Sequence, residues 1–193
     1  MSRSHLRREL RRRRRALSLR EQKEASQALC RHLRIVPVVR RARHIALYWP
    51  NDGEIDPRPF RRNAEQCGKH CYLPVLHPVH HNRLWFFQLN DHTTLSRNRF
   101  GIPEPLIRGG LSRPAWALDL ILMPLVGFTK NGDRLGMGGG FYDRTFEFLK
   151  QSQRHSPKLM GLAHECQRVD SLPSAGWDIP MDCIVTEQGL YRV

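Results

Sequence analysis

The first residues of the chain combine a narrow apolar stripe with many basic positions. Leu6, Leu10 and Leu17 fall near one face of a helix whose other faces carry arginine. An apolar stripe at this spacing is typical of a helix that buries one side. The pattern therefore predicts a basic amphipathic helix over residues 4–17.

A capping signal follows this helix. Ser18 and Glu21 have the spacing of a capping box, in which a serine side chain and a glutamate three residues later satisfy backbone amides reciprocally. The signal ends the first helix and predicts a second one over about residues 19–34.

Short apolar runs bounded by turn residues indicate buried strands further along the chain. They occupy residues 44–49, 70–76, 84–89, 118–124, 158–163 and 183–186. Asp56 and Pro57 are suited to the N-cap and first position of a helix that Gly68 would end. Another helix is expected over about residues 141–151, whereas residues 90–117, rich in Gly, Pro and Arg, are expected to run over the surface.

The alternation of strands and helices favours an α/β fold with an open, mainly parallel sheet. In such sheets ligands bind at the carboxyl ends of the strands. The length of 193 residues and the 40% hydrophobic content suit a single domain over residues 1–193, with a basic N-terminal helical arm at about residues 1–18.

Composition narrows the expected cellular setting. The sequence has no run of about 18 apolar residues and no apolar core of a secretory signal near its start, so neither a membrane span nor export is predicted. Its five cysteines are scattered and agree with reduced thiols. We therefore expect a soluble, cytoplasmic protein.

The net charge of +14 is concentrated at one end of the chain. Residues 1–43 hold 15 Lys or Arg against three acidic residues, a net of +12, whereas residues 44–193 hold 17 against 15, a net of +2. Arginine-rich segments bind phosphate backbones without reading bases, so a nucleic-acid-binding protein acting through the arm is the alternative hypothesis. No RRM, KH, zinc-finger or helix-turn-helix signature accompanies the arm. Most of residues 11–15 are expected to face solvent or a loosely held polyanion.

The segment RLGMGGGFYD, from Arg134 to Asp143, has four glycines in five positions, after a predicted strand and before a predicted helix. Glycines let backbone N–H groups approach a phosphate, a helix N-terminus favours anions, and Arg134 adds positive charge. The segment is neither a P-loop nor a dinucleotide fingerprint, since no Lys-Ser/Thr follows and Phe141 stands where the fingerprint needs glycine. By itself the loop also fits a tight structural turn, or a kinase-like or sugar-phosphate enzyme.

A zinc hypothesis can be raised for a second group of residues. Cys67 and Cys71 lie four residues apart, and His77, His80 and His81 follow them. No second spaced pair supports a metal site, so a core face and a solvated turn are the favoured interpretation.

Residues 119–144, DLILMPLVGFTKNGDRLGMGGGFYDR, closely resemble the signature region of the 5-formyltetrahydrofolate cyclo-ligase family. Other features of that family occur in the same order, namely Arg3, Leu6 and Arg7, Trp49, Glu54 and Ile55, Leu73 and Pro74, the IPEP of residues 102–105, then Trp177, Asp178 and Asp182 followed by IVTE. The resemblance covers nearly the whole chain. It implies a single three-layer α/β domain with a Rossmann-like sheet, and a ligase that uses ATP and Mg²⁺ to close 5-formyltetrahydrofolate to 5,10-methenyltetrahydrofolate.

The resemblance also implies a role for individual residues. The nucleotide contacts would be Arg3, Arg7, Arg134, Leu135, Gly136, Met137, Gly138, Gly139, Gly140, Phe141 and Tyr142. The folate contacts would be Trp49, Glu54, Met137, Gly138, Gly139, Gly140 and Phe141. Arg134 and Tyr142 would be catalytic, Asp143 and Asp178 would bind Mg²⁺, and Asp182 would be structural. Without the resemblance, Asp143 would be a first-turn helix carboxylate and Trp49 a core residue.

The family's reaction suits these residue types. The formyl oxygen attacks the γ-phosphate of ATP, N10 adds to the resulting imidate carbon, and phosphate leaves. Phosphoryl transfer depends on positioning and charge neutralisation, which loop amides, arginines and a carboxylate-bound Mg²⁺ provide. Some members have a lysine where this chain has Gly139, so Arg134, the arm or the metal must supply that charge. The expected partners are a reduced folate and ATP, with nonspecific RNA association through the arm as a further one, and the expected state is a monomer.

Overall fold

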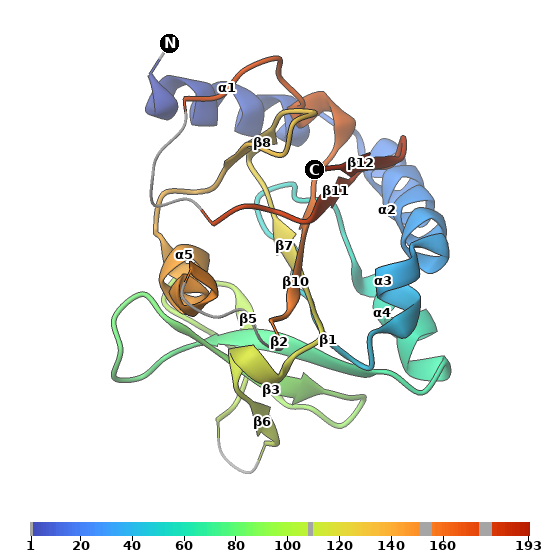
Figure 1. The fold of residues 1–193 in the computed structure, drawn as a ribbon, viewed down its shortest axis with the longest axis vertical. Coiled ribbons are helices and arrows are strands. Elements are labelled where there is room, and N and C mark those ends of the chain that lie inside the picture. The colour runs from blue at the N-terminus through green and yellow to red at the C-terminus, as the bar shows by residue number, and fades with distance from the viewer. Residues whose placement is uncertain (1, 108–109, 151–155, 174–178) are drawn as a thin grey trace.

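A mixed β-sheet forms the centre of the computed structural model, which describes residues 2–107, 110–150, 156–173 and 179–193 (Figure 1). Across the sheet the strands of these residues follow the order β12 (Leu190–Arg192), β11 (Cys183–Val185), β10 (Lys158–Leu162), β7 (Leu120–Pro124), β1 (His44–Ala46), β2 (His70–Leu76), β3 (Leu84–Leu89) and β6 (Ser112–Arg113). The five strands from β11 to β2 are parallel, and β12, β3 and β6 run antiparallel to their neighbours. The predicted α/β class with a mainly parallel sheet is therefore confirmed.

Helices and short hairpins surround this sheet. The helices are α1 (Arg3–Arg15), α2 (Leu19–Ile35), α3 (Pro37–Arg41), α4 (Arg58–Gln66) and α5 (Phe141–Thr145), with 3-10 turns η1 (Ala115–Ala117), η2 (Glu147–Lys150) and η3 (Glu165–Gln167). The hairpins pair β4 (Leu95–Arg97) with β5 (Pro103–Pro105) and β8 (Gly127–Phe128) with β9 (Arg134–Leu135). Within the described ranges, every helix is too short or too polar to cross a bilayer.

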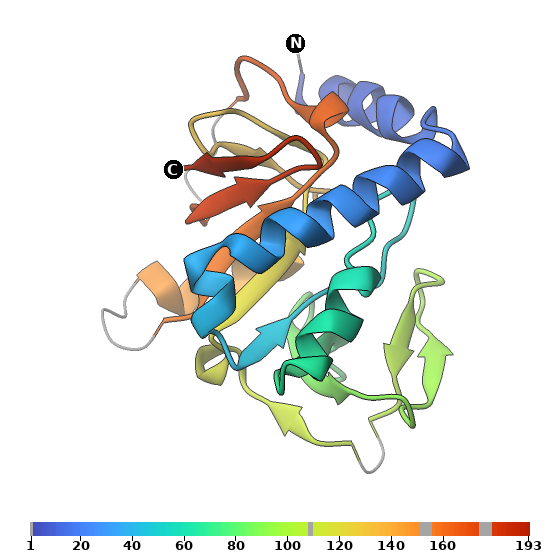
Figure 2. The same ribbon diagram turned by 90° about the vertical axis from the view of Figure 1, so that its right-hand side faces the viewer.

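Apolar side chains cover the sheet on both faces and give the molecule three layers. On one face, Leu29 and Leu33 of α2 and Phe60 of α4 pack in one core with Leu120 of β7. On the other face, Phe146 belongs to a second core together with residues of β3, β7 and β11. Figure 2 shows α2 and α4 over the near face, with α5 emerging beyond the sheet.

Helix α1 lies across the end of the molecule toward which β7 and β10 run (Figure 1). Leu10 is fully buried there in a small core with Val126 and Leu135. A β-carbon on Gly127 would lie 2.4 Å from Leu10 Cδ1, so only glycine allows this close approach. The carboxyl ends of the central strands are thus covered by the first helix of the chain.

The predicted elements differ from the structure mainly at their ends. The capping box of Ser18 and Glu21 is present, and β2 and β3 have the predicted bounds. The strand predicted over residues 44–49 ends at Ala46, and the helix predicted over residues 141–151 ends at Thr145 before a 3-10 turn. Helix α4 begins after Pro57, one position later than predicted, while the Asp56 carboxylate accepts from the amide of Arg58 at 2.9 Å.

Candidate functional site

The glycine loop follows the β8–β9 hairpin and leads into α5 at the carboxyl edge of the sheet. Gly138 and Gly140 adopt left-handed φ values of 96° and 67°, which a side chain would strain. Because α5 is five residues long, its dipole is small, and the capacity of this loop to hold an anion rests on its amides and neighbouring cations. Met137 is half exposed, whereas Leu135 is completely buried and packs in the core with Leu10.

Arg7 lies directly against this loop. Its Nε donates to the Gly136 carbonyl at 2.8 Å, and a β-carbon on Gly138 would lie 3.4 Å from its guanidinium carbon. Arg3, one turn earlier on α1, donates to the Pro173 carbonyl at 3.0 Å. The structure therefore brings Arg7 to the glycine loop as expected, and places Arg3 beside the segment that ends at residue 173.

Arg134 and Asp143 form an ion pair beneath the loop. Arg134 is mostly buried, and its Nε donates to the Ile179 carbonyl at 2.9 Å. Asp143 also accepts from the Ile179 amide at 3.3 Å. The predicted phosphate-binding arginine and the predicted metal-binding carboxylate thus neutralise each other here.

Metal binding by this region was predicted from Asp143 and Asp178. Asp178 lies outside the described residues. In the part of the chain that the structure describes, no three His, Cys, Asp or Glu side chains are grouped so as to hold a metal ion. Mg²⁺ is often bound by one or two carboxylates together with substrate phosphates, so Asp143 alone remains a suitable ligand for nucleotide-bound Mg²⁺.

Glu54 closes a tight turn after β1. Its amide donates to the Asn51 carbonyl and its carboxylate accepts from the Asn51 amide, each at 3.0 Å. Burial raises the pKa of Glu54 to about 7, against the attraction of Arg14, whose Nη2 lies 3.7 Å from Oε1. Burial also raises the pKa of Tyr142 well above its usual range, and the nearby Glu54 carboxylate adds to this effect. Two residues predicted for different halves of the site, Glu54 and Tyr142, are therefore neighbours.

Trp49 and Phe141, both expected beside the folate ring, have different surroundings. Trp49 is half-buried against the core, with the Arg58 guanidinium carbon 4.9 Å from its ring centroid. Phe141 instead meets Phe100 edge-on, with 5.7 Å between ring centroids. The roles of Trp49 and Phe141 beside the folate ring stay predictions, with Trp49 partly buried against the core and Phe141 next to a second aromatic ring.

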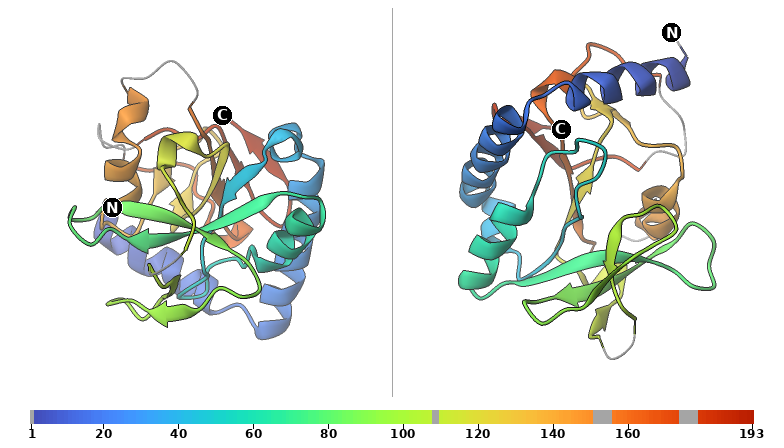
Figure 3. Two further views of the ribbon diagram at one scale, coloured as in Figure 1. Left: turned by 90° about the horizontal axis from the view of Figure 1, so that it is seen from below. Right: turned by 180° about the vertical axis from the view of Figure 1, so that it is seen from behind.

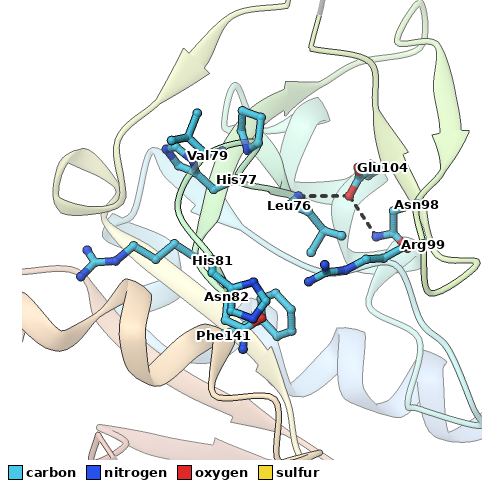
Figure 4. Close-up of a pocket in the computed structure, with 11 residues that line it drawn as sticks. Leu76, His77, Val79, His81, Asn82, Asn98, Arg99, Glu104 and Phe141 are labelled. Carbon is cyan, nitrogen blue, oxygen red and sulfur yellow. Dashed lines mark hydrogen bonds between the residues drawn. The ribbon is translucent and has the colours of Figure 1, made fainter.

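A cavity of about 320 Å³ opens beside Phe141 (Figure 4). It lies between the β2–β3 turn, the β4–β5 hairpin and α5, and is lined by Leu76, His77, Pro78, Val79, His81, Asn82, Arg83, Asn98, Arg99, Glu104 and Phe141. The Glu104 carboxylate accepts from the Leu76 amide at 3.1 Å and from Asn98 Nδ2 at 2.9 Å. Asn82 Nδ2 donates to the Gly139 carbonyl at 3.1 Å, which ties the turn to the glycine loop.

Of these lining residues, only Phe141 was assigned to the site, and that assignment came from the resemblance to the family. The others come from the end of β2, from the β2–β3 turn and from the surface excursion of residues 90–117, whose tertiary position no periodicity reveals. The IPEP of residues 102–105 was the available signal, because it placed Glu104 within a segment shared with the family. Figure 3 shows α5 between α1 and the β2–β3 turn. Phe141, the first residue of α5, follows the glycine loop and lines the cavity.

The arginine run differs from expectation at one position. Arg12, Arg13 and Arg15 are exposed, as predicted for most of residues 11–15, but Arg14 is completely buried. The Arg14 guanidinium forms an ion pair with the Asp52 carboxylate, which also binds Arg11 and Arg15. Arg12 and Arg13 are exposed and pair with Glu9 along the helix.

Comparisons with known proteins agree on one family. The model of the 5-formyltetrahydrofolate cyclo-ligase family matches residues 1–187. The 5-formyltetrahydrofolate cyclo-ligase of Escherichia coli K12 is 40% identical over 183 residues, covering 95% of this chain and 99% of the relative. That of Haemophilus influenzae is also 40% identical, over 93% of this chain and 94% of the relative.

Solved structures give the same result. The NMR structure of Aquifex aeolicus 5,10-methenyltetrahydrofolate synthetase has a TM-score of 0.83 and 32% identity, covering 100% of this chain and 93% of its own. A 5,10-methenyltetrahydrofolate synthetase from Mycoplasma pneumoniae has a TM-score of 0.74 and 25% identity, covering 97% and 99%.

Proposed function

Because this chain belongs to the 5-formyltetrahydrofolate cyclo-ligase family, we propose that it closes 5-formyltetrahydrofolate to 5,10-methenyltetrahydrofolate at the expense of ATP. The observation that carries the proposal is the meeting of three features at one edge of the sheet. They are the glycine loop with Arg7, the partly buried and electrostatically coupled Glu54 and Tyr142, and the cavity beside Phe141. The glycine loop with Arg7 suits a phosphate chain. Glu54, Tyr142 and the cavity beside Phe141 suit a flat ring with a polar edge.

The chemistry requires activation of a poor leaving group. The formyl oxygen attacks the γ-phosphorus of ATP and ADP departs, so that the oxygen becomes a phosphate ester of an imidate. N10 then adds to the activated carbon and loses its proton, and inorganic phosphate leaves with the former formyl oxygen. The amides of the glycine loop, Arg7 and Arg134 would hold the phosphates and offset the charge on the transferring group.

The pterin ring and its glutamate tail place different demands on the protein. We assign Glu54 to the polar edge of the ring, since a buried carboxylate binds N–H donors strongly. Phe141 supplies an apolar face next to it. Arg83 and Arg99 at the cavity suit the carboxylates of the tail, and Figure 4 shows Arg99 extending toward Asn82 and Phe141. We assign Tyr142, whose hydroxyl stays neutral because burial raises its pKa, to donate to a ligand oxygen.

Asp143 and Asp178 are the residues that we propose to bind Mg²⁺. When bound to the nucleotide, this ion would neutralise phosphate charge. Binding requires Asp143 to leave or share its ion pair with Arg134, which would release positive charge toward the phosphates.

A direct assay tests the proposed reaction. Protein, 5-formyltetrahydrofolate, ATP and Mg²⁺ are mixed and the absorbance of the methenyl product is followed, with controls lacking ATP or protein. We expect the band to rise only in the complete mixture. An unchanged band in the complete mixture, with folded protein, would refute the proposed activity.

We further propose that residues 1–193 act as one domain, as a monomer in the cytoplasm. The nucleic-acid hypothesis has no support in the comparisons, and the contacts of Arg11, Arg14 and Arg15 with Asp52 account for part of the arm's charge. Nonspecific RNA association would then involve the exposed arginines Arg12 and Arg13. Light scattering and RNA retention at increasing salt concentration test these two points.

A further inference from the structure

Arg14 is a fully buried arginine that none of the family motifs includes. Its Nε donates to the Asp52 carbonyl at 2.8 Å, Nη2 donates to Asp52 Oδ2 at 2.8 Å, and Nη1 donates to the Leu125 carbonyl at 3.3 Å. Nη2 also lies 3.7 Å from Glu54 Oε1. Burying a guanidinium is costly unless its donors are satisfied, so this set of acceptors holds Arg14 in one defined position.

The partner of Arg14 is the turn that carries Glu54. Asp52 and Gly53 take left-handed φ values of 56° and 74°, and a β-carbon on Gly53 would lie 3.3 Å from the Arg14 carbonyl oxygen. Burial opposes ionisation of Asp52, but hydrogen bonds from Arg11, Arg15 and Arg14 lower its pKa to about 2. The turn is thus an ionised, tightly folded segment fixed onto the last turn of α1.

The same helix contacts the glycine loop two turns earlier. Arg7, Leu10 and Arg14 are spaced three and seven residues apart, so they share one face of α1. Arg7 Nε donates to the Gly136 carbonyl at 2.8 Å, and Leu10 contacts Gly127. A single helix face therefore joins the glycine loop to the Glu54 turn.

We infer that Arg14 is a positioning residue, which fixes the Glu54 carboxylate relative to the glycine loop so that the folate ring and the nucleotide are held in one geometry. The inference rests on the proposed function, because that function assigns Glu54 to the folate ring. Arg14 acts through the 51–54 turn and through its charge, without touching substrate.

The charged groups around Glu54 allow the role of Arg14 to be tested by titration, independently of the kinetics. The ionisable groups that face it are Arg11 and Arg14 of α1, Asp52 of its own turn, Tyr48 after β1 and Tyr142 of α5. Burial raises the pKa of Glu54 to about 7, and Arg14 is the main group that lowers it. Arg14 also faces His164, whose pKa burial lowers to about 4, so this imidazole is neutral and adds no charge at pH 7. Loss of the Arg14 charge should therefore raise the pKa of Glu54 further.

Two substitutions separate geometry from charge. Arg14→Met removes the charge, whereas Arg14→Lys keeps it but cannot make all three donor contacts. Arg12→Met, on the exposed face of the same helix, is the matched control. For both Arg14 variants we expect the KM for 5-formyltetrahydrofolate to rise roughly tenfold or more and the KM for ATP to change less than about threefold.

The pH profile distinguishes the two variants. Activity needs ionised Glu54, so the acid limb of kcat/KM for the folate should move to higher pH in Arg14→Met and stay near the wild-type position in Arg14→Lys. Titration of Glu54 by ¹³C NMR, assigned with Glu54→Gln, should show the same rise in Arg14→Met without any turnover. The melting temperature of each variant shows whether it is folded, and Arg14→Lys carries the test if Arg14→Met does not fold.

Several results would overturn the inference. One is an unshifted Glu54 titration in folded Arg14→Met, and another is an equal rise of both KM values in Arg14→Lys. A control Arg12→Met with the same folate defect would also overturn it. Failure of the wild type to form methenylfolate would refute the proposed function instead, while the NMR titration would still decide whether Arg14 sets the ionisation of Glu54.

Discussion

Glu54 is a carboxyl group whose burial works against its ionisation. Its pKa is raised from 4.5 to about 7 because the desolvation of the carboxylate outweighs the attraction of Arg14. Between those two values the folded protein binds a proton that the unfolded chain releases, so the contribution of Glu54 to stability falls as the pH rises through this interval. At neutral and higher pH the ionised Glu54 therefore lowers the free energy of unfolding, and it provides a charged hydrogen-bond acceptor close to Tyr142.

Replacement of Glu54 by Gln should remove this penalty. Relative to wild type, Glu54→Gln should gain roughly 1–3 kcal/mol of unfolding free energy on going from pH 4.5 to pH 8, because the amide is never ionised. Denaturant unfolding at the two pH values measures the change, with the exposed Glu24→Gln as control. An equal difference between variant and wild type at both pH values would contradict the raised pKa. The same variant should lose most of its folate affinity.

Arg134 and Asp143 form an ion pair in this structure, and we predict a different role for each. Arg134→Ala should lower ATP-dependent turnover by roughly 10²-fold or more, with a smaller effect on folate binding, because one preorganised charge at a transferring phosphate has a large effect.

Asp143→Asn should mainly raise the Mg²⁺ concentration required for half-activity, since an amide is a weaker ligand for a hard cation. Steady-state kinetics over a range of Mg²⁺ concentrations separate the two effects. Equal losses of stability in both variants, with unchanged Mg²⁺ dependence, would mean that the ion pair is only structural.

At the scale of elements, α1 is a helix with two different faces. The inner face carries Arg7, Leu10 and Arg14, each in contact with a different part of the site region. On the exposed side, Arg12 and Arg13 pair with Glu9, and such surface pairs add little to stability. The arginines of the arm therefore form two groups. Those of the inner face contact the site region, whereas Arg12 and Arg13 pair within the helix.

The two faces should respond differently to substitution. Replacing Arg3 and Arg7 by Ala should raise the KM for ATP substantially, because Arg7 lies against the glycine loop. Replacing Arg12 and Arg13 by Ala should mainly reduce RNA retention and its salt dependence. ATP kinetics and RNA binding at several salt concentrations compare two variants that lose the same charge. A larger ATP defect in the second variant would mean that the arm attracts anions only in a general way.

Elements with a strong local signal were predictable from the sequence, and those that depend on distant contacts were not. The second helix has its own capping box, and β2 and β3 are largely apolar runs bounded by turn residues, so their bounds were predicted closely. The β4–β5 hairpin, in contrast, lines the cavity only because it folds back beside β2. Arg14 resembles its neighbours in sequence, and its burial depends on Asp52, which lies 38 residues away. The glycine loop was recognisable, but its one-turn helix and the Arg134–Asp143 pair required the tertiary structure.

At the scale of the whole molecule, the site region lies at the edge of the sheet where the parallel strands have their carboxyl ends. The parallel strands direct their carboxyl ends toward α1, while the β2–β3 turn and the β4–β5 hairpin extend beyond the sheet and enclose the cavity. Asn82 joins that turn to the glycine loop through the Gly139 carbonyl. The proposed phosphate and folate halves are therefore carried by separate parts of the chain that meet at Phe141.

The cavity should determine how tightly the anionic tail of the folate is held. Arg99→Ala should raise the KM for 5-formyltetrahydrofolate several-fold, about the effect of one partly exposed ion pair, and leave the KM for ATP unchanged. Arg62→Ala, on the exposed side of α4, is the control for loss of one positive charge. A folate analogue without the glutamate tail should bind wild type and Arg99→Ala equally. Unequal binding of that analogue would place Arg99 next to the ring instead.

The position of α1 over the carboxyl edge also orders the events of biosynthesis. The arm is synthesised before the sheet, yet the acceptor of Arg14 Nη1 is a carbonyl 111 residues later in the chain. During translation Arg14 Nη1 cannot reach this acceptor until β7 has been made, and contacts between distant parts of a chain form slowly because loop closure must precede them. A nascent chain stalled before residue 125 would therefore lack this contact and leave the arm only partly docked, with Asp52 as the available partner of Arg11, Arg14 and Arg15.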